Sequence, residues 1–131
     1  MNPALVPYPP AIRRAALVIA LLLAAGIAWL SLIPGGTVPA PHLSDKVRHF
    51  GAYATLAIPV AMWFGPGRLV AVLVLTLYGA GLEVAQGLLS ETREASFFDA
   101  VANALGASTG ALLVWIIART RAKRDLTDSD R

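Results

Sequence analysis

A glutamate, Glu83, lies inside the apolar stretch 69–89, where a lipid-soluble helix would normally carry no ionisable group. Placing such a group in a bilayer costs roughly 2.5–3.5 kcal/mol on insertion scales, so intramembrane carboxylates usually mark functional sites. Within a helix, the carboxylate must pair with a cation, accept strong hydrogen bonds or carry a proton. The sequence offers His49 and Arg93 as cationic partners. This residue therefore marks the place where binding or proton chemistry is expected.

Two further apolar stretches carry polar side chains that recur one helical turn apart. Asp45, His49 and Tyr53 fall at i, i+4 and i+8, so a helix carries them on one face. Asp99 and Asn103 repeat the i, i+4 spacing in another stretch. With the pair from 69–89, the candidate site residues are Asp45, His49, Tyr53, Glu83, Gln86, Asp99 and Asn103.

Structural roles compete with functional ones at several of these positions. Asp99 or Ser96 would cap the start of one helix, and Asp45 or Ser44 would cap the start of another. An amide such as that of Asn103 often joins neighbouring membrane helices by hydrogen bonds. A lone histidine in an apolar stretch is more often a satisfied core group than a ligand. The mid-helix glutamate has no comparable structural role.

Four apolar segments are long enough to position these residues within a membrane. A bilayer core about 30 Å thick needs about 20 mostly apolar residues in a helix. The chain of 131 residues is 56% hydrophobic and 15% charged, whereas soluble domains average about 25% charged residues. We predict an all-α integral membrane bundle, a single domain with short loops between antiparallel helices. Its four transmembrane spans are expected at about 15–33, 45–64, 69–89 and 97–118, followed by a basic and polar cytoplasmic tail at 119–131.

The distribution of positive charge predicts the direction of these spans. Three of the 11 lysines and arginines lie in the loops 34–48 and 90–96, and the other eight lie at the opposite ends of the segments. The positive-inside rule therefore predicts that both termini are cytoplasmic and that these two loops face outward. The candidate polar groups then lie in the outer half of the bilayer. Because the basic residues cluster at the ends of apolar segments, we predict a lipid bilayer and not nucleic acid as partner.

The run Asp-Lys-Val-Arg-His-Phe-Gly-Ala-Tyr at 45–53 resembles the DKxxHfxaY signature of VanZ-like membrane proteins. The later residues resemble the family pattern ExxQ…R…D…N..G…G, which ends here at Gly106 and Gly110. The resemblance covers about residues 43–112 and implies a small, bacterial, four-helix protein of the inner membrane and cell envelope. The family's founding member is associated with antibiotic resistance, namely to the glycopeptide teicoplanin. The resemblance also implies one site made of Asp45, Lys46, His49, Tyr53, Glu83, Gln86, Arg93, Asp99 and Asn103.

The first functional hypothesis is an envelope binding protein whose polar site holds a lipid-linked or glycan-bearing headgroup at the outer leaflet. Lys46 and Arg93 would attract the anionic part of that ligand. Asn103 and Gln86 would orient it by hydrogen bonds. Glu83 would balance the charge of the site or bind an amine.

The second hypothesis is an intramembrane hydrolase or transferase. His49 and Glu83 would act as base and orienting group, and Arg93 would stabilise developing negative charge. A proton-coupled transporter is a third reading. It ranks last because the cytoplasmic halves of the spans are nearly without polar groups.

The sequence contains no local motif for binding a metal ion or a cofactor. His and carboxylate side chains do converge, but there is no HExxH or similar ligand spacing, and we predict no metal. The chain has no cysteine and no glycine-rich phosphate loop before a helix, and we predict no cofactor. The identity of the ligand and the oligomeric state stay open at this point.

Overall fold

Residues 8–33, 42–89 and 95–129 are described by a computed structural model, and this part of the chain forms four helices and no strand. The expectation of an all-α fold is confirmed. In chain order the helices are α1 (Pro10–Leu32), α2 (Asp45–Phe64), α3 (Leu69–Leu89) and α4 (Phe97–Ser129).

Three of these helices are long and apolar enough to cross a membrane, namely α1, α3 and the segment Phe97–Arg124 of α4. Large apolar side chains on their outer surfaces are exposed, such as Leu22 at 69% and Leu77 at 72%. These helices are compatible with a multi-pass membrane protein. The 20 residues of α2 have the length of a span, but its first turns carry the polar residues of the site.

The helix bounds agree with the sequence-based prediction for α2 and α3 and differ at the outer ends of the bundle. Pro10 starts α1 before residue 15, in the first-turn position that proline favours. Past residue 118, α4 continues to Ser129. Charged residues end an apolar segment but do not end a helix, because arginine and lysine are good helix formers.

Glycines bring α2 and α4 into close contact. A Cβ atom on Gly106 would overlap the carbonyl oxygen of Phe50, and one on Gly110 would overlap that of Ala54. Such small-residue grooves allow membrane helices to approach at backbone distance. The groove that Gly106 and Gly110 form on α4 therefore faces α2, and it sets how closely the polar residues of the two helices approach.

The turn between α2 and α3 fixes these two helices as neighbours. Gly65 (φ 106°) and Gly67 (φ 76°) both adopt the left-handed backbone that favours glycine. The Gly65 N–H also donates to the carbonyl oxygen of Ala61 at 2.9 Å, which closes the last turn of α2. The chain thus reverses within a few residues.

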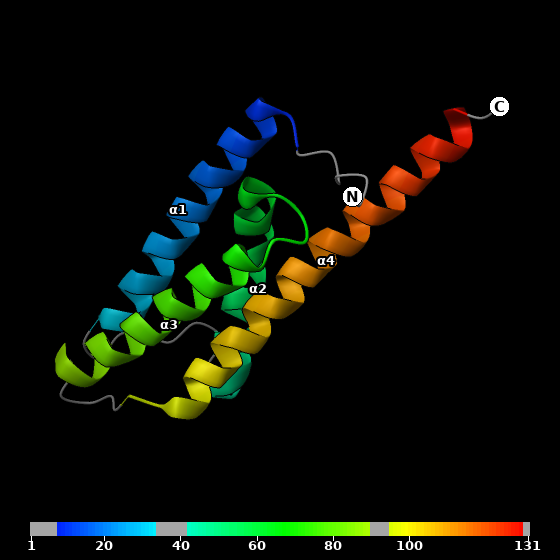
Figure 1. Ribbon diagram of the computed structural model, residues 1–131. Coiled ribbons are helices and arrows are strands. Elements are labelled where there is room, and N and C mark those ends of the chain that lie inside the picture. Colours follow the sequence, from blue (N-terminus) through cyan, green and yellow to red (C-terminus); the bar gives the residue numbers. More distant parts are fainter. Residues whose placement is uncertain (1–7, 34–41, 90–94, 130–131) are drawn as a thin grey trace.

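The start of α1 and the end of α4 lie at one end of the bundle (Figure 1). The opposite end gathers the end of α3 and the starts of α2 and α4, as Figure 1 shows. All the polar residues predicted for the site that the structure describes belong to these three helices.

Candidate functional site

Glu83 occupies the interior of this end of the bundle and is 6% exposed. Its Oε2 atom accepts the backbone N–H of Ser96 at 3.1 Å, and its Oε1 atom lies 3.6 Å from Nδ1 of His49. One of the three expected ways of accommodating a buried carboxylate, a hydrogen-bond donor, is therefore realised, and an imidazole lies beside the carboxylate.

His49 connects α2 to both of the other helices of the site. Its Nδ1 atom lies 3.0 Å from Oδ1 of Asn103 on α4, in addition to its approach to Glu83 on α3. Its Nε2 atom lies 3.8 Å from Oδ2 of Asp45 on the same helix, one turn away. Asn103 and Glu83 thus orient the ring at Nδ1, and Nε2 faces the carboxylate of Asp45.

Serines, not aspartates, cap the two helices that start at the site. The Ser96 hydroxyl accepts the backbone N–H of Asp99 at 3.3 Å, and the Ser44 hydroxyl accepts that of Val47 at 3.4 Å. The capping role that competed with a functional role is therefore filled by the serines. The carboxylates of Asp99 and Asp45 have other surroundings.

Asp99 is buried, with a relative exposure of 7%. Its Oδ1 atom has no hydrogen-bond partner among the described residues, and the nearest cation, Lys46 Nζ, lies 3.9 Å away. That lysine side chain is 61% exposed. Asp45 is more exposed, and its Oδ1 atom accepts a 2.6 Å hydrogen bond from Arg48. The site is thus rimmed by two solvent-accessible cationic side chains.

Tyr53 lies next to the polar cluster and is 2% exposed. Its ring and the side chain of Asn103 both pack against Gly79, where an added Cβ would meet them at 3.1 Å and 3.0 Å. The Tyr53 hydroxyl has no hydrogen-bond partner in the part of the chain that is described. Buried hydroxyls without partners are uncommon in proteins, so this one calls for a partner such as a water molecule or a ligand.

Gln86 and Arg93 do not join the cluster in the described structure. The Gln86 amide donates to the carbonyl oxygen of Ser31 on α1 at 3.0 Å, so this residue fastens α3 to α1. Arg93 lies outside the described residues. The structure brings together Asp45, Lys46, His49, Tyr53, Glu83, Asp99 and Asn103.

No protein-family model, curated protein or solved structure matches this chain.

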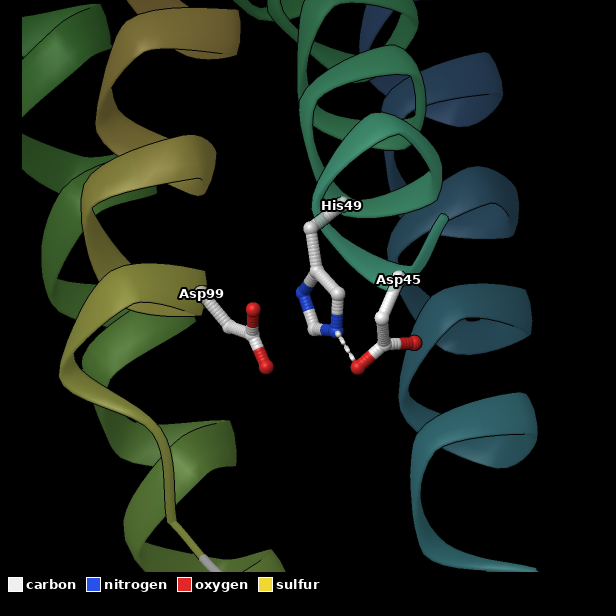
Figure 2. A group of neighbouring side chains, drawn as sticks. All are labelled: Asp45, His49 and Asp99. Carbon is white, nitrogen blue, oxygen red and sulfur yellow. Dashed lines mark ion pairs between the residues drawn. The ribbon is translucent and has the colours of Figure 1, made fainter. Parts of the chain in front are cut away.

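Asp45, His49 and Asp99 form a tight group at the mouth of the site. One potential ligand atom from each residue lies within 4.8 Å of those of the other two. Figure 2 shows the three side chains pointing toward one another, two from α2 and one from α4. Chemically, the site offers an oriented imidazole, two carboxylates at the mouth and a third, buried carboxylate behind the ring.

Three contacts at and near the site were not predicted from the sequence, and only one of them has a signal there. The Ser96 backbone N–H binds Glu83, yet any residue type can supply this donor. Arg48 pairs with Asp45, and its i, i+3 spacing is the signal that identifies that pair. Ser31 acts through its carbonyl oxygen, so its side chain gives no indication of its contact with Gln86.

Proposed function

We propose that this protein is a multi-pass membrane protein that binds the polar headgroup of a lipid or lipid-linked molecule at the outer face of the cell membrane. The observation that carries the proposal is the polar cluster between α2, α3 and α4, in which the Tyr53 hydroxyl and Asp99 Oδ1 are buried and have no hydrogen-bond partner among the described residues. Buried polar groups in proteins are normally hydrogen-bonded, so such atoms favour an external partner.

The mouth of the site carries both signs of charge, because Lys46 and Arg48 lie beside the carboxylates of Asp99 and Asp45, and the two cations suit the anionic part of a ligand. Lys46 is exposed at the rim, and the starts of α2 and α4 lie beside it. Lysine binds phosphate as a point charge, and helix N-termini carry a partial positive charge that favours anions. A phosphate-bearing headgroup is therefore the ligand class that we propose.

In the proposed topology α2 crosses the membrane in addition to α1, α3 and α4, and both termini lie in the cytoplasm. The charge bias of the loops supports it. In this orientation the site opens to the outer leaflet of a bacterial inner membrane. Membership of the VanZ-like family, and a link to glycopeptide resistance, are part of this proposal and rest on the sequence pattern at 45–53 and 83–110.

Two conservative variants test the proposal through lipid co-purification. Tyr53→Phe removes a hydroxyl that has no protein partner, so we expect loss of the enriched headgroup class without loss of folded protein. Tyr78→Phe is the matched control, because its hydroxyl donates to the Ala24 carbonyl oxygen at 2.6 Å and faces another helix. Lipids extracted from both purified variants and identified by mass spectrometry give the readout. A lipid profile of Tyr53→Phe identical to that of the unaltered protein would count against headgroup binding.

A second candidate function, an intramembrane hydrolase or transferase, is favoured by one specific arrangement. His49 has its Nδ1 atom beside Glu83 and Asn103, and its Nε2 atom faces the open side of the ring. An imidazole oriented by a carboxylate is a common general base. Turnover of polyprenyl or phospholipid substrates by the purified protein, abolished by His49→Ala, would favour this function over binding alone.

A further inference from the structure

The group formed by Asp45, His49 and Asp99 has the donor types of a metal site. One imidazole nitrogen and two carboxylate oxygens lie within 4.8 Å of one another. A tetrahedral Zn²⁺ ion with ligand bonds of about 2.0–2.2 Å places its donors about 3.4 Å apart. His49 Nε2 and Asp45 Oδ2 lie 3.8 Å apart, so a small rotation of the exposed Asp45 side chain brings them to that spacing.

The surroundings of His49 leave the nitrogen that faces Asp45 free to bind a cation. Both neighbours of Nδ1 are oxygen atoms, Asn103 Oδ1 at 3.0 Å and Glu83 Oε1 at 3.6 Å, which favours the tautomer that carries the proton on Nδ1. The lone pair then lies on Nε2. Metal-binding histidines almost always donate their other N–H to a carboxylate or carbonyl oxygen in this way.

The two aspartates are not fully used by other partners. Asp99 is only 7% exposed, and its Oδ1 atom has no hydrogen-bond partner among the described residues. Its carboxylate points toward His49 and Asp45 in Figure 2. Arg48 occupies Oδ1 of Asp45, but Oδ2 faces the imidazole. Arg48 and Lys46 each lie beside one of these carboxylates, and a cation between the two carboxylates would offset their mutual repulsion further.

We propose that Asp45, His49 and Asp99 bind a divalent transition-metal cation, with Zn²⁺ as the best fit, between the starts of α2 and α4. The mixed nitrogen and oxygen donors favour such an ion over Mg²⁺ or Ca²⁺, which prefer oxygen ligands throughout. Three protein ligands leave a coordination position open, as in catalytic zinc sites. The Asp45 side chain is 52% exposed, so a water or a phosphate oxygen has access to the group.

This inference departs from the sequence-based prediction of no metal, and the reason is the origin of the ligands. Local zinc motifs place their ligands within one segment, whereas here two ligands come from α2 and the third from α4. The metal site is also tested separately from headgroup binding, because metal uptake is compared between variants that are held in the same lipid.

Metal titration of the full-length, tag-free protein in nanodiscs tests the proposal. The protein is stripped with a chelator and titrated with Zn²⁺ in competition with a chromogenic chelator. We expect one Zn²⁺ per chain, and at least about tenfold weaker binding in Asp45→Asn and in Asp99→Asn, since even outer-shell changes cost 10–100-fold. His42→Ala is the matched control for histidine binding at the surface, because His42 is exposed and lies outside the group. It should bind Zn²⁺ as the unaltered protein does.

Absence of Zn²⁺ uptake by the folded protein would overturn the proposal, and so would uptake that neither aspartate substitution weakens. The exposed position of Asp45 makes Asp45→Asn the variant least able to disturb folding, so it decides the result if Asp99→Asn does not fold. Co²⁺ provides a second measurement, because its visible ligand-field absorption should report a four-coordinate site in the unaltered protein and change in Asp45→Asn.

Discussion

The carboxylate of Glu83 holds the start of α4 against the end of α3, because its Oε2 atom accepts the backbone N–H of Ser96 at 3.1 Å. The same side chain approaches His49 of α2 through its other oxygen at 3.6 Å. One buried acid thereby joins three helices at the end of the bundle where the polar residues gather. Its contribution to the stability of the fold can therefore be measured by substitution.

Glu83→Ala should lower the free energy of unfolding by about 1–3 kcal/mol, since it removes the acceptor of the Ser96 N–H and leaves this donor unpaired. Glu83→Gln keeps an oxygen for this N–H and should cost about 1 kcal/mol. Val84→Ala is the control, because Val84 is 58% exposed on the outer surface of the same helix. Thermal unfolding in detergent measures all three. Equal losses for Ala and Gln at position 83 would contradict the role assigned to the Ser96 contact.

Two tyrosines whose ring centroids lie 6.2 Å apart should respond oppositely to loss of their hydroxyl groups. The Tyr78 hydroxyl donates to the Ala24 carbonyl oxygen, so Tyr78→Phe should lower the free energy of unfolding by about 0.5–1.5 kcal/mol. The Tyr53 hydroxyl is buried without a partner among the described residues, so Tyr53→Phe should leave stability unchanged or raise it. Parallel unfolding curves of the two variants give the comparison. A destabilised Tyr53→Phe protein would show that this hydroxyl has a structural partner.

The contact between α2 and α4 predicts a large difference between two glycine substitutions. Gly106→Ala should destabilise the protein by about 1–3 kcal/mol, because its Cβ would overlap the Phe50 carbonyl oxygen and force the helices apart. Gly81→Ala should be neutral or stabilising by up to about 1 kcal/mol, since nothing lies within 4 Å of its added Cβ and alanine favours the helix. The Gly106→Ala variant should also weaken Zn²⁺ binding, because Asp99 moves away from Asp45. Unchanged stability in Gly106→Ala would rule out this tight packing.

The length of the apolar segments was enough to predict α2 and α3. The i, i+4 spacing was enough to predict the shared face of Asp45 and His49, because this spacing fixes neighbours on the surface of one helix. It was not enough to predict contacts between helices. Asp99 meets that face only because the glycines of α4 let it approach α2. Gln86 was expected beside Glu83, but three residues rotate a helix by about 300°, so its side chain is turned about 60° away. That rotation directs it to Ser31 of α1.

The orientation of the protein, and the status of α2 as a fourth span, can be tested with two single cysteines in a chain that contains none. Lys46 lies in the first turn of α2 and Arg68 lies shortly after its last residue, and both are exposed. We expect a membrane-impermeant maleimide to label Lys46→Cys in intact cells and to label Arg68→Cys only after permeabilisation, because loops rich in positive charge stay in the cytoplasm. The reverse pattern would place the polar site on the cytoplasmic side. Labelling of both positions from the same side would mean that α2 does not cross the membrane, and the proposed outward-facing site would have to be abandoned.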